Sequence, residues 1–95
     1  MPFPPYQDGE AALLSELQRR GGRARPTDKD EHRRTVYEAL ADHFNLTQED
    51  RDTTIVENGQ HRSKWHNMVR WAVRQLRKQD RLRPSKDEHG IWAVV

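Results

Sequence analysis

Gly59–Pro84, GQHRSKWHNMVRWAVRQLRKQDRLRP, is the stretch from which the fold of this chain can be worked out. On a helical wheel of about 100° per residue, its apolar side chains fall on one face, which must therefore be buried. That face comprises Trp65, Met68, Val69, Ala72 and Leu76. The opposite face comprises Ser63, Asn67, Arg70, Arg74 and Arg77, with Lys64 and Lys78 on its flanks. The spacing predicts an amphipathic helix that is anchored in a small core and presents cations outward.

Charge is distributed unevenly along the chain, although the net charge is only +2 at neutral pH. Between Gly59 and Lys86 there are nine Lys or Arg and one acidic residue, whereas residues 26–58 hold nine acidic and four basic residues. A solvated surface helix normally mixes signs, because opposite charges four residues apart stabilise it. The one-sided charge therefore indicates an acidic partner, and we interpret residues 60–78 as a helix that reads double-stranded DNA.

Length and composition limit the chain to one small domain. Its 95 residues are only 33% hydrophobic, so we expect a compact core centred on Trp65, Trp71 and Trp92. The absence of cysteine excludes disulfides and thiolate zinc sites. His61 and His66 would point about 140° apart on a helix, so no metal site is expected, and no sequence motif implies a cofactor. No signal peptide or run of about 20 apolar residues is present, which predicts a cytoplasmic protein without a membrane partner.

The first quarter of the chain predicts an arm, a helix and a linker. Residues 1–7 contain three prolines and are expected to form an extended arm ahead of a domain spanning residues 8–95. Asp8 is suited to cap a helix that runs to about Arg20 and ends at two glycines. The basic segment Arg23–Pro26 is then expected to be a linker.

A second helix is expected from about Asp28 to Phe44. Thr27 followed by Asp30 three residues later resembles a capping box, and this predicts where the helix begins. Thr47 with Asp50 predicts one further short helical turn by the same rule.

Strand-forming residues lie on both sides of the basic helix. Residues 52–60, DTTIVENGQ, predict an irregular loop or a short strand that closes in a turn at Asn58-Gly59. After the helix, residues 81–84 and 91–95 predict a β-hairpin, with Gly90 supplying the turn. The order of helix, helix, reading helix and hairpin is that of a winged helix-turn-helix domain, mainly α with a small β-hairpin wing.

Three segments together resemble the amino-terminal winged-helix domain of Mrr-type restriction endonucleases. They are LLSELQRRGG, VYEALADHFNLTQED, and WHNMVRWAVRQLRKQDRL followed by GIWAV, and the resemblance covers about residues 10–95. In that family the domain binds DNA ahead of a separate nuclease domain, and the enzymes restrict DNA that carries modified bases. The resemblance implies a bacterial, nucleoid-associated targeting domain for modified, above all methylated, DNA. It also implies a nuclease domain in the same parent chain.

Individual side chains of the basic helix can be assigned to phosphates or bases. Lys64, Arg74 and Arg77 are expected to pair with phosphates, whereas Asn67 and Arg70 have the hydrogen-bonding groups that suit base edges. Helix starts bind anions through free backbone N–H groups, so Arg62 and Ser63 are candidates for a phosphate site; Ser63 as a plain N-cap is the alternative. His66 is expected to donate to DNA more strongly below neutral pH.

Trp71 and the predicted wing leave alternatives open. Trp71 lies beside the apolar face, and burial in the core is the favoured interpretation because a tryptophan gains so much from burial. Its alternative role, shared with Asn67, is contact with a modified base. In the wing, Arg83 and Lys86 are candidate phosphate ligands, although acidic neighbours in the same loop oppose this.

The competing hypothesis is a protein-interaction module. Opposed acidic and basic regions permit self-association, including a homodimer, without DNA. Catalysis is not expected from this segment, because no lysine follows an acidic residue at the two-residue spacing that the nucleases of the resembled family use, and no phosphate-binding glycine loop is present.

Overall fold

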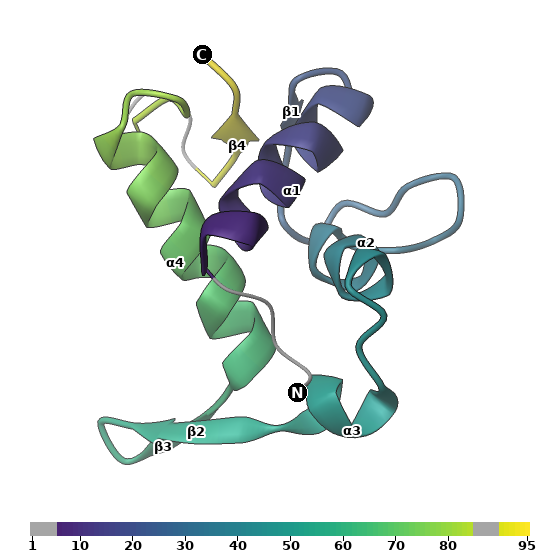
Figure 1. Cartoon of the computed structure of the whole chain (residues 1–95), viewed down its shortest axis with the longest axis vertical. Helices are drawn as coiled ribbons and strands as arrows, with labels where there is room; N and C mark the ends of the chain where they lie inside the picture. The colour runs from purple at the N-terminus through teal and green to yellow at the C-terminus, as the bar shows by residue number, and fades with distance from the viewer. Residues whose placement is uncertain (1–5, 85–89) are drawn as a thin grey trace.

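The fold is mainly helical, and its described residues also form two small two-stranded antiparallel sheets. The computed structural model describes residues 6–84 and 90–95. Its elements are, in order, α1 (Tyr6–Arg19), β1 (Arg23–Ala24), α2 (Val36–His43), α3 (Gln48–Asp52), β2 (Thr54–Glu57), β3 (Gln60–Ser63), α4 (Lys64–Lys78) and β4 (Trp92–Ala93). Figure 1 shows α4 along one side of the molecule, with α1 and α2 beside it and the β2–β3 hairpin at its amino-terminal end.

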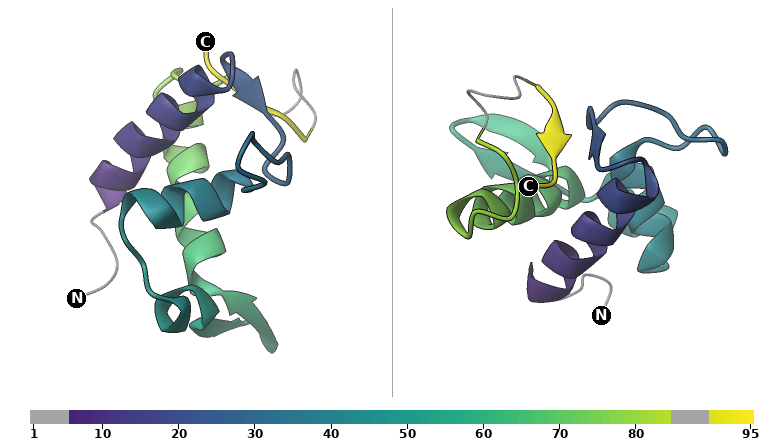
Figure 2. Two further views of the ribbon diagram at one scale, coloured as in Figure 1. Left: turned by 90° about the vertical axis from the view of Figure 1, so that its right-hand side faces the viewer. Right: turned by 90° about the horizontal axis from the view of Figure 1, so that it is seen from above.

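The core lies where α1 and α2 pack against one side of α4. Figure 2 shows α1 and α2 together in front of α4 in the side view. Trp65 and Trp92 are buried, as the sequence predicts, and the Trp65 indole N–H donates to the carbonyl of Tyr37 at 2.9 Å. The predicted apolar face of α4 is confirmed, with two differences. Val73, which was not predicted, is buried in the core, and Met68 is only partly buried against it.

A β-hairpin directly precedes α4, and the sequence pattern predicted only part of it. β2 and β3 pair antiparallel, and their turn is formed by Asn58 at φ 52° and Gly59 at φ 77°. Two positive φ values in sequence are what a tight hairpin turn requires, and Asn-Gly adopts them readily. The expected short strand and turn are confirmed. The helix begins at Lys64 rather than near residue 60, because residues 60–63 form β3.

A minimal sheet closes the domain beside the carboxy-terminal end of α4. β1 pairs antiparallel with β4, with Arg23 opposite Ala93 and Ala24 opposite Trp92. Leu82 forms a bridge to Val94 on the other side, so the predicted pairing of the two wing segments is confirmed there. The linker expected at residues 23–26 is wrong for its first two residues, which form β1. This is the arrangement of a winged-helix-like single domain.

The second helix is much shorter than the sequence reasoning predicted. It begins at Val36, where Thr35 and Glu38 form a complete capping box. Asp30 does not cap a helix; its carboxylate accepts the backbone N–H groups of His32 and Arg34, each at 2.9 Å. Arg33 between them has φ 60°, which a helix does not allow. The predicted start near Asp28 is therefore wrong.

The other helix boundaries agree more closely with prediction. Thr47 and Asp50 form the predicted capping box of α3. α1 begins at Tyr6, so Asp8 lies in its first turn rather than at its cap, and residues 6 and 7 of the expected arm are helical. The first five residues of that arm lie outside the described residues.

Candidate nucleic-acid interface

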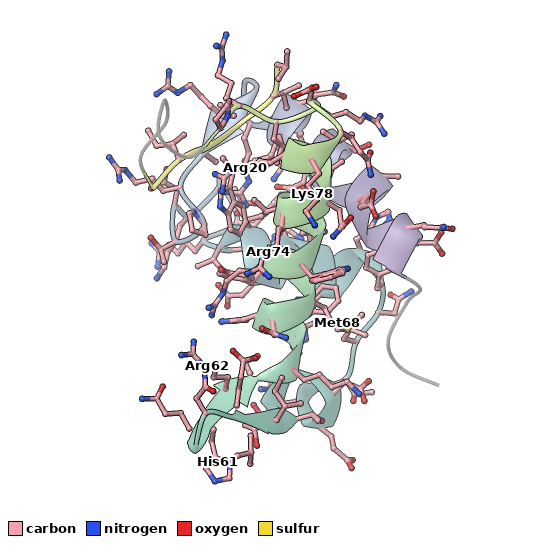
Figure 3. The ribbon with its side chains drawn as sticks, turned by 90° about the vertical axis from the view of Figure 1, so that its left-hand side faces the viewer. Arg20, His61, Arg62, Met68, Arg74 and Lys78 are labelled. Carbon is pink, nitrogen blue, oxygen red and sulfur yellow. The ribbon has the colours of Figure 1, made fainter. Side chains whose placement is uncertain are left out.

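The outward face of α4 presents cations and one aromatic ring to solvent. Arg70, Trp71, Arg74 and Lys78 are exposed, whereas Lys64, Asn67 and Arg77 are partly exposed. Figure 3 shows Arg74 and Lys78 extending from the same side of this helix. No Asp or Glu occurs between Lys64 and Lys78, so no acid of the helix itself neutralises these charges. The side chains of the predicted basic face are therefore exposed or partly exposed along α4.

One side of this face forms the wall of a groove. The groove has a volume of about 660 Å³ and lies between α4 and the segments around β1, α2 and β4. Its lining residues are Pro26, Tyr37, Arg70, Val73, Arg74, Arg77, Lys78, Gly90 and Trp92. Among the residues that the structure describes there, four are cationic and none is acidic, so this part of the groove favours an anionic group. Arg70, predicted to read bases, thus lies beside the predicted phosphate ligands Arg74 and Arg77.

Arg77 also has a role in holding the fold together. Its Nε donates to the carbonyl of Arg83 at 3.1 Å, which ties the end of α4 to the segment that bridges to Val94. Burial lowers the pKa of Arg77 from its usual value, although a guanidinium remains charged at any physiological pH. Arg83 itself is exposed. Lys86, the other candidate in the predicted wing, lies outside the described residues.

The start of α4 differs from prediction at Arg62. Ser63 is the N-cap, and its hydroxyl accepts the backbone N–H of His66 at 3.2 Å. Arg62 lies in β3 rather than on the helix; it donates to the Gln60 side chain at 3.2 Å and lies 3.9 Å from a Glu57 carboxylate oxygen. Figure 3 shows Arg62 and His61 on the hairpin beyond the amino-terminal end of α4. Arg62 therefore lies just before the helix start, whereas Ser63 caps the helix.

His66 packs against the protein rather than pointing freely outward. Its ring stacks on that of Tyr37, with centroids 3.9 Å apart and planes inclined by 14°. Burial, together with the charge of Arg70, lowers the pKa of His66 below its usual value. An approaching phosphate would favour the protonated form, so the predicted contact would require proton uptake against this environment.

Trp71 is exposed, which overturns its favoured assignment to the core. Its exposed fraction is 41%, and the Arg74 guanidinium carbon lies 5.9 Å from the centroid of its ring. Val73, which lies nearly opposite Trp71 on the helical wheel, belongs to the core instead and is 3% exposed. Nearly half of this large apolar ring thus faces solvent within a cationic surface, as an aromatic platform requires.

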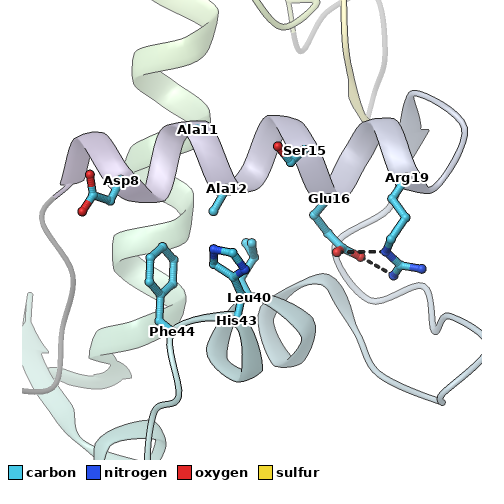
Figure 4. A pocket seen from close by; sticks show the side chains of 9 residues that line it. All are labelled: Asp8, Ala11, Ala12, Ser15, Glu16, Arg19, Leu40, His43 and Phe44. Carbon is cyan, nitrogen blue, oxygen red and sulfur yellow. Dashed lines mark hydrogen bonds and ion pairs between the residues drawn. The ribbon is translucent and has the colours of Figure 1, made fainter.

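A second cavity lies on the other side of α1 and has a different character. It has a volume of about 580 Å³ and lies between α1 and α2, as Figure 4 shows. Its walls include Asp8 and Glu16, and Glu16 is paired with Arg19 at 2.6 Å. Because its acids offset its cations, this cavity lacks the one-sided charge of the α4 groove. Within residues 6–84 and 90–95, no helix has the length and apolar character to cross a bilayer.

A family model described as the Mrr N-terminal domain matches residues 8–94. The chain belongs to the Mrr N-terminal domain family. Membership associates this Mrr N-terminal domain with Mrr-type restriction systems, in which such a domain is the amino-terminal part of a larger protein. No curated protein and no solved structure matches the chain.

Proposed function

We propose that this Mrr N-terminal domain binds double-stranded DNA through the exposed face of α4 and directs a restriction nuclease to modified DNA. The observation that supports this most strongly is the row of Arg70, Arg74 and Lys78 on a helix that contains no acid. The major groove of B-DNA admits an α-helix, and cations on its flanks pair with the phosphates on either side. Family membership supports the link to restriction.

The same face offers two side chains for base recognition. Asn67 carries an amide that matches the N6 and N7 edge of adenine. Trp71 lies one turn further along α4 and presents an exposed apolar ring, which is suited to contact with a methyl group on a base. We propose that these two residues detect the modification, and that the surrounding cations supply most of the affinity.

Fluorescence anisotropy with labelled duplexes tests this proposal. Unmodified duplexes and duplexes with N6-methyladenine or 5-methylcytosine are compared over a range of salt. Each phosphate contact contributes about −0.9 to the slope of log affinity against log salt, so about five contacts give a slope near −4 to −5. Trp71→Ala should reduce the preference for the modified duplex while leaving the salt slope unchanged, because the indole carries no charge.

Two results would contradict the proposal in different ways. Equal affinity for all duplexes, with a steep salt slope, would leave a DNA-binding domain without modification specificity. Failure to bind any duplex at low salt, together with a molecular mass that rises with protein concentration, would instead favour a protein-interaction module.

A further inference from the structure

The β2–β3 hairpin projects from the amino-terminal end of α4 and contributes little to the core. None of the residues of β2 or β3 is buried, and Val56 is 66% exposed. Figure 1 shows the hairpin lying across the end of α4 and extending beyond it, on the side away from α1 and α2. The tight turn at Asn58 and Gly59 holds the two strands in one register. Core packing therefore does not explain why the chain forms this hairpin.

The two faces of the hairpin carry different side chains. Side chains alternate along a strand, so the register of β2 and β3 assigns each residue to a face. One face comprises Ile55, Glu57, Gln60 and Arg62, and the other comprises Thr54, Val56, His61 and Ser63. Figure 3 shows Arg62 pointing toward the side of α4 from which Arg74 extends, whereas His61 points away from the helix. The face with Arg62 therefore continues the basic face of α4 past the amino-terminal end of the helix.

The Arg62 guanidinium is only weakly neutralised by its neighbours. The nearest carboxylate oxygen, on Glu57, lies 3.9 Å from its Nε, which is too long for a hydrogen bond. Gln60 accepts one hydrogen bond from the guanidinium at 3.2 Å, and Nε has no hydrogen-bond partner among the described residues. Arg51, by contrast, lies 2.7 Å from a carboxylate oxygen of Asp42. A guanidinium that is paired as loosely as that of Arg62 retains its capacity to bind an anion.

A duplex bound to α4 would place a phosphate backbone beside the hairpin. The major groove is about 12 Å wide, and an α-helix with its side chains is about 10–12 Å across, so the helix fills the groove. An element that crosses the end of such a helix extends over the phosphates at the groove edge. Arg62 precedes the first residue of α4 by two positions, so it lies where this backbone would pass. Glu57, on the same face, would repel the same phosphates.

We infer that the β2–β3 hairpin lies on the phosphate backbone beside the amino-terminal end of α4, where Arg62 binds a phosphate and Glu57 limits the strength of that contact. This inference rests on the proposed function and adds a second DNA-binding element to the helix. Phosphates occur at every step of a duplex, so this contact carries no sequence information. The hairpin instead fixes the orientation in which α4 meets the bases.

Two charge removals of opposite sign test this inference in the same anisotropy assay. Arg62→Gln should weaken binding to every duplex and reduce the salt slope by about 0.9, so its loss of affinity should grow about threefold between about 0.3 M and 0.1 M salt. Arg62→Lys keeps the charge and should keep the slope. Glu57→Gln removes the repulsion and should strengthen binding to every duplex. Lys29→Gln, the control, removes one exposed charge from the loop before α2 and should leave the slope unchanged. All four variants should melt with the parent, because none of these side chains is buried.

The outcomes separate this inference from the proposed function. A reduced slope in Arg62→Gln but not in Lys29→Gln, together with tighter binding of Glu57→Gln, supports the hairpin contact. If Arg62→Gln binds like Lys29→Gln while Arg74→Ala loses affinity, DNA contacts α4 alone and the inference is wrong. Weaker binding of Glu57→Gln would also overturn it, because removal of a carboxylate beside a phosphate relieves repulsion.

Two further results would assign the hairpin differently. A dimer in analytical ultracentrifugation that Val56→Thr abolishes, with DNA affinity unchanged in Arg62→Gln, would make the hairpin an interface with a second copy of the chain and overturn the inference. If the parent chain fails to bind any duplex at low salt, the proposed function fails together with the inference.

Discussion

Replacement of Trp65 by alanine should come close to unfolding the domain. The side chain is only 3% exposed, and a buried tryptophan removes about 150–250 Å² from water. At about 25 cal/mol per Å² this corresponds to roughly 4–6 kcal/mol, and measured losses for tryptophan to alanine are about 3–5 kcal/mol. The indole N–H bond to the Tyr37 carbonyl is lost as well. A domain of this size has about 5–14 kcal/mol of stability in total.

Urea unfolding followed by far-ultraviolet circular dichroism measures this loss without relying on tryptophan fluorescence. In thermal unfolding followed by the same signal, we expect the Trp65→Ala melting temperature to fall by at least 12 °C, since about 4–8 °C is lost per kcal/mol in a domain of this size. Trp65→Phe keeps most of the ring but loses the hydrogen bond, and should cost about 1–2 kcal/mol.

Trp71→Ala is the matched control, because it removes the same side chain from the same helix. With 41% of that residue already exposed, the same area relation gives roughly 2–4 kcal/mol, which is less than the loss expected for Trp65. Equal destabilisation by the two alanine variants would refute the burial assigned to each face of α4. A Trp65→Ala protein that unfolds at the urea concentration of the parent would refute the core itself.

Three further predictions concern the loop and the ends of the helices. Thr35→Ala should destabilise the domain by about 1 kcal/mol in urea unfolding, because it removes the cap of α2. Although burial opposes ionisation of Asp30, hydrogen bonds from Arg34 and His32 prevail and lower its pKa. The ionised Asp30 carboxylate therefore stabilises the fold above about pH 4, and this stabilisation is lost as the pH falls further. Between pH 5 and pH 3, the free energy of unfolding should fall less for Asp30→Asn than for the parent, as urea unfolding at each pH measures. Arg77→Ala removes the bond to the Arg83 carbonyl and should speed hydrogen exchange at the Arg83 amide, which donates to Ala93.

The helix α4 could be predicted because its signal is local. Apolar residues at helical spacing define the buried face of α4, and four of the five predicted side chains are fully buried there. Trp71 could not be placed in this way, because its wheel position lies at the edge of the apolar face. A residue at the edge of the apolar face is buried only if another element packs over it. In this domain α2 and β4 lie beside Val73, at the opposite edge of the apolar face from Trp71.

The second helix was mispredicted because two capping boxes compete in the sequence. Thr27 with Asp30 and Thr35 with Glu38 both have the required spacing, and the second has the preferred glutamate. Arg19, Arg20 and Arg34 gather around Asp30, with Arg19 at 2.9 Å and Arg34 at 3.1 Å. Of these partners, Arg19 and Arg20 are distant in sequence, and local propensity cannot reveal them. Likewise, Asn58-Gly59 predicted a turn. The sequence did not show that residues 60–63 would pair with β2 and so complete a hairpin.

The antiparallel pairing of β1 with β4 has a consequence for how the protein is made. It joins Arg23 to Ala93, so the two strands are separated by most of the chain and include nearly its last residues. Contacts of such long sequence separation form late and slow folding. On the ribosome, α1 and α2 can therefore pack against α4 while β1 still lacks its partner strand, and this end of the domain closes only after the residues of β4 have left the exit tunnel.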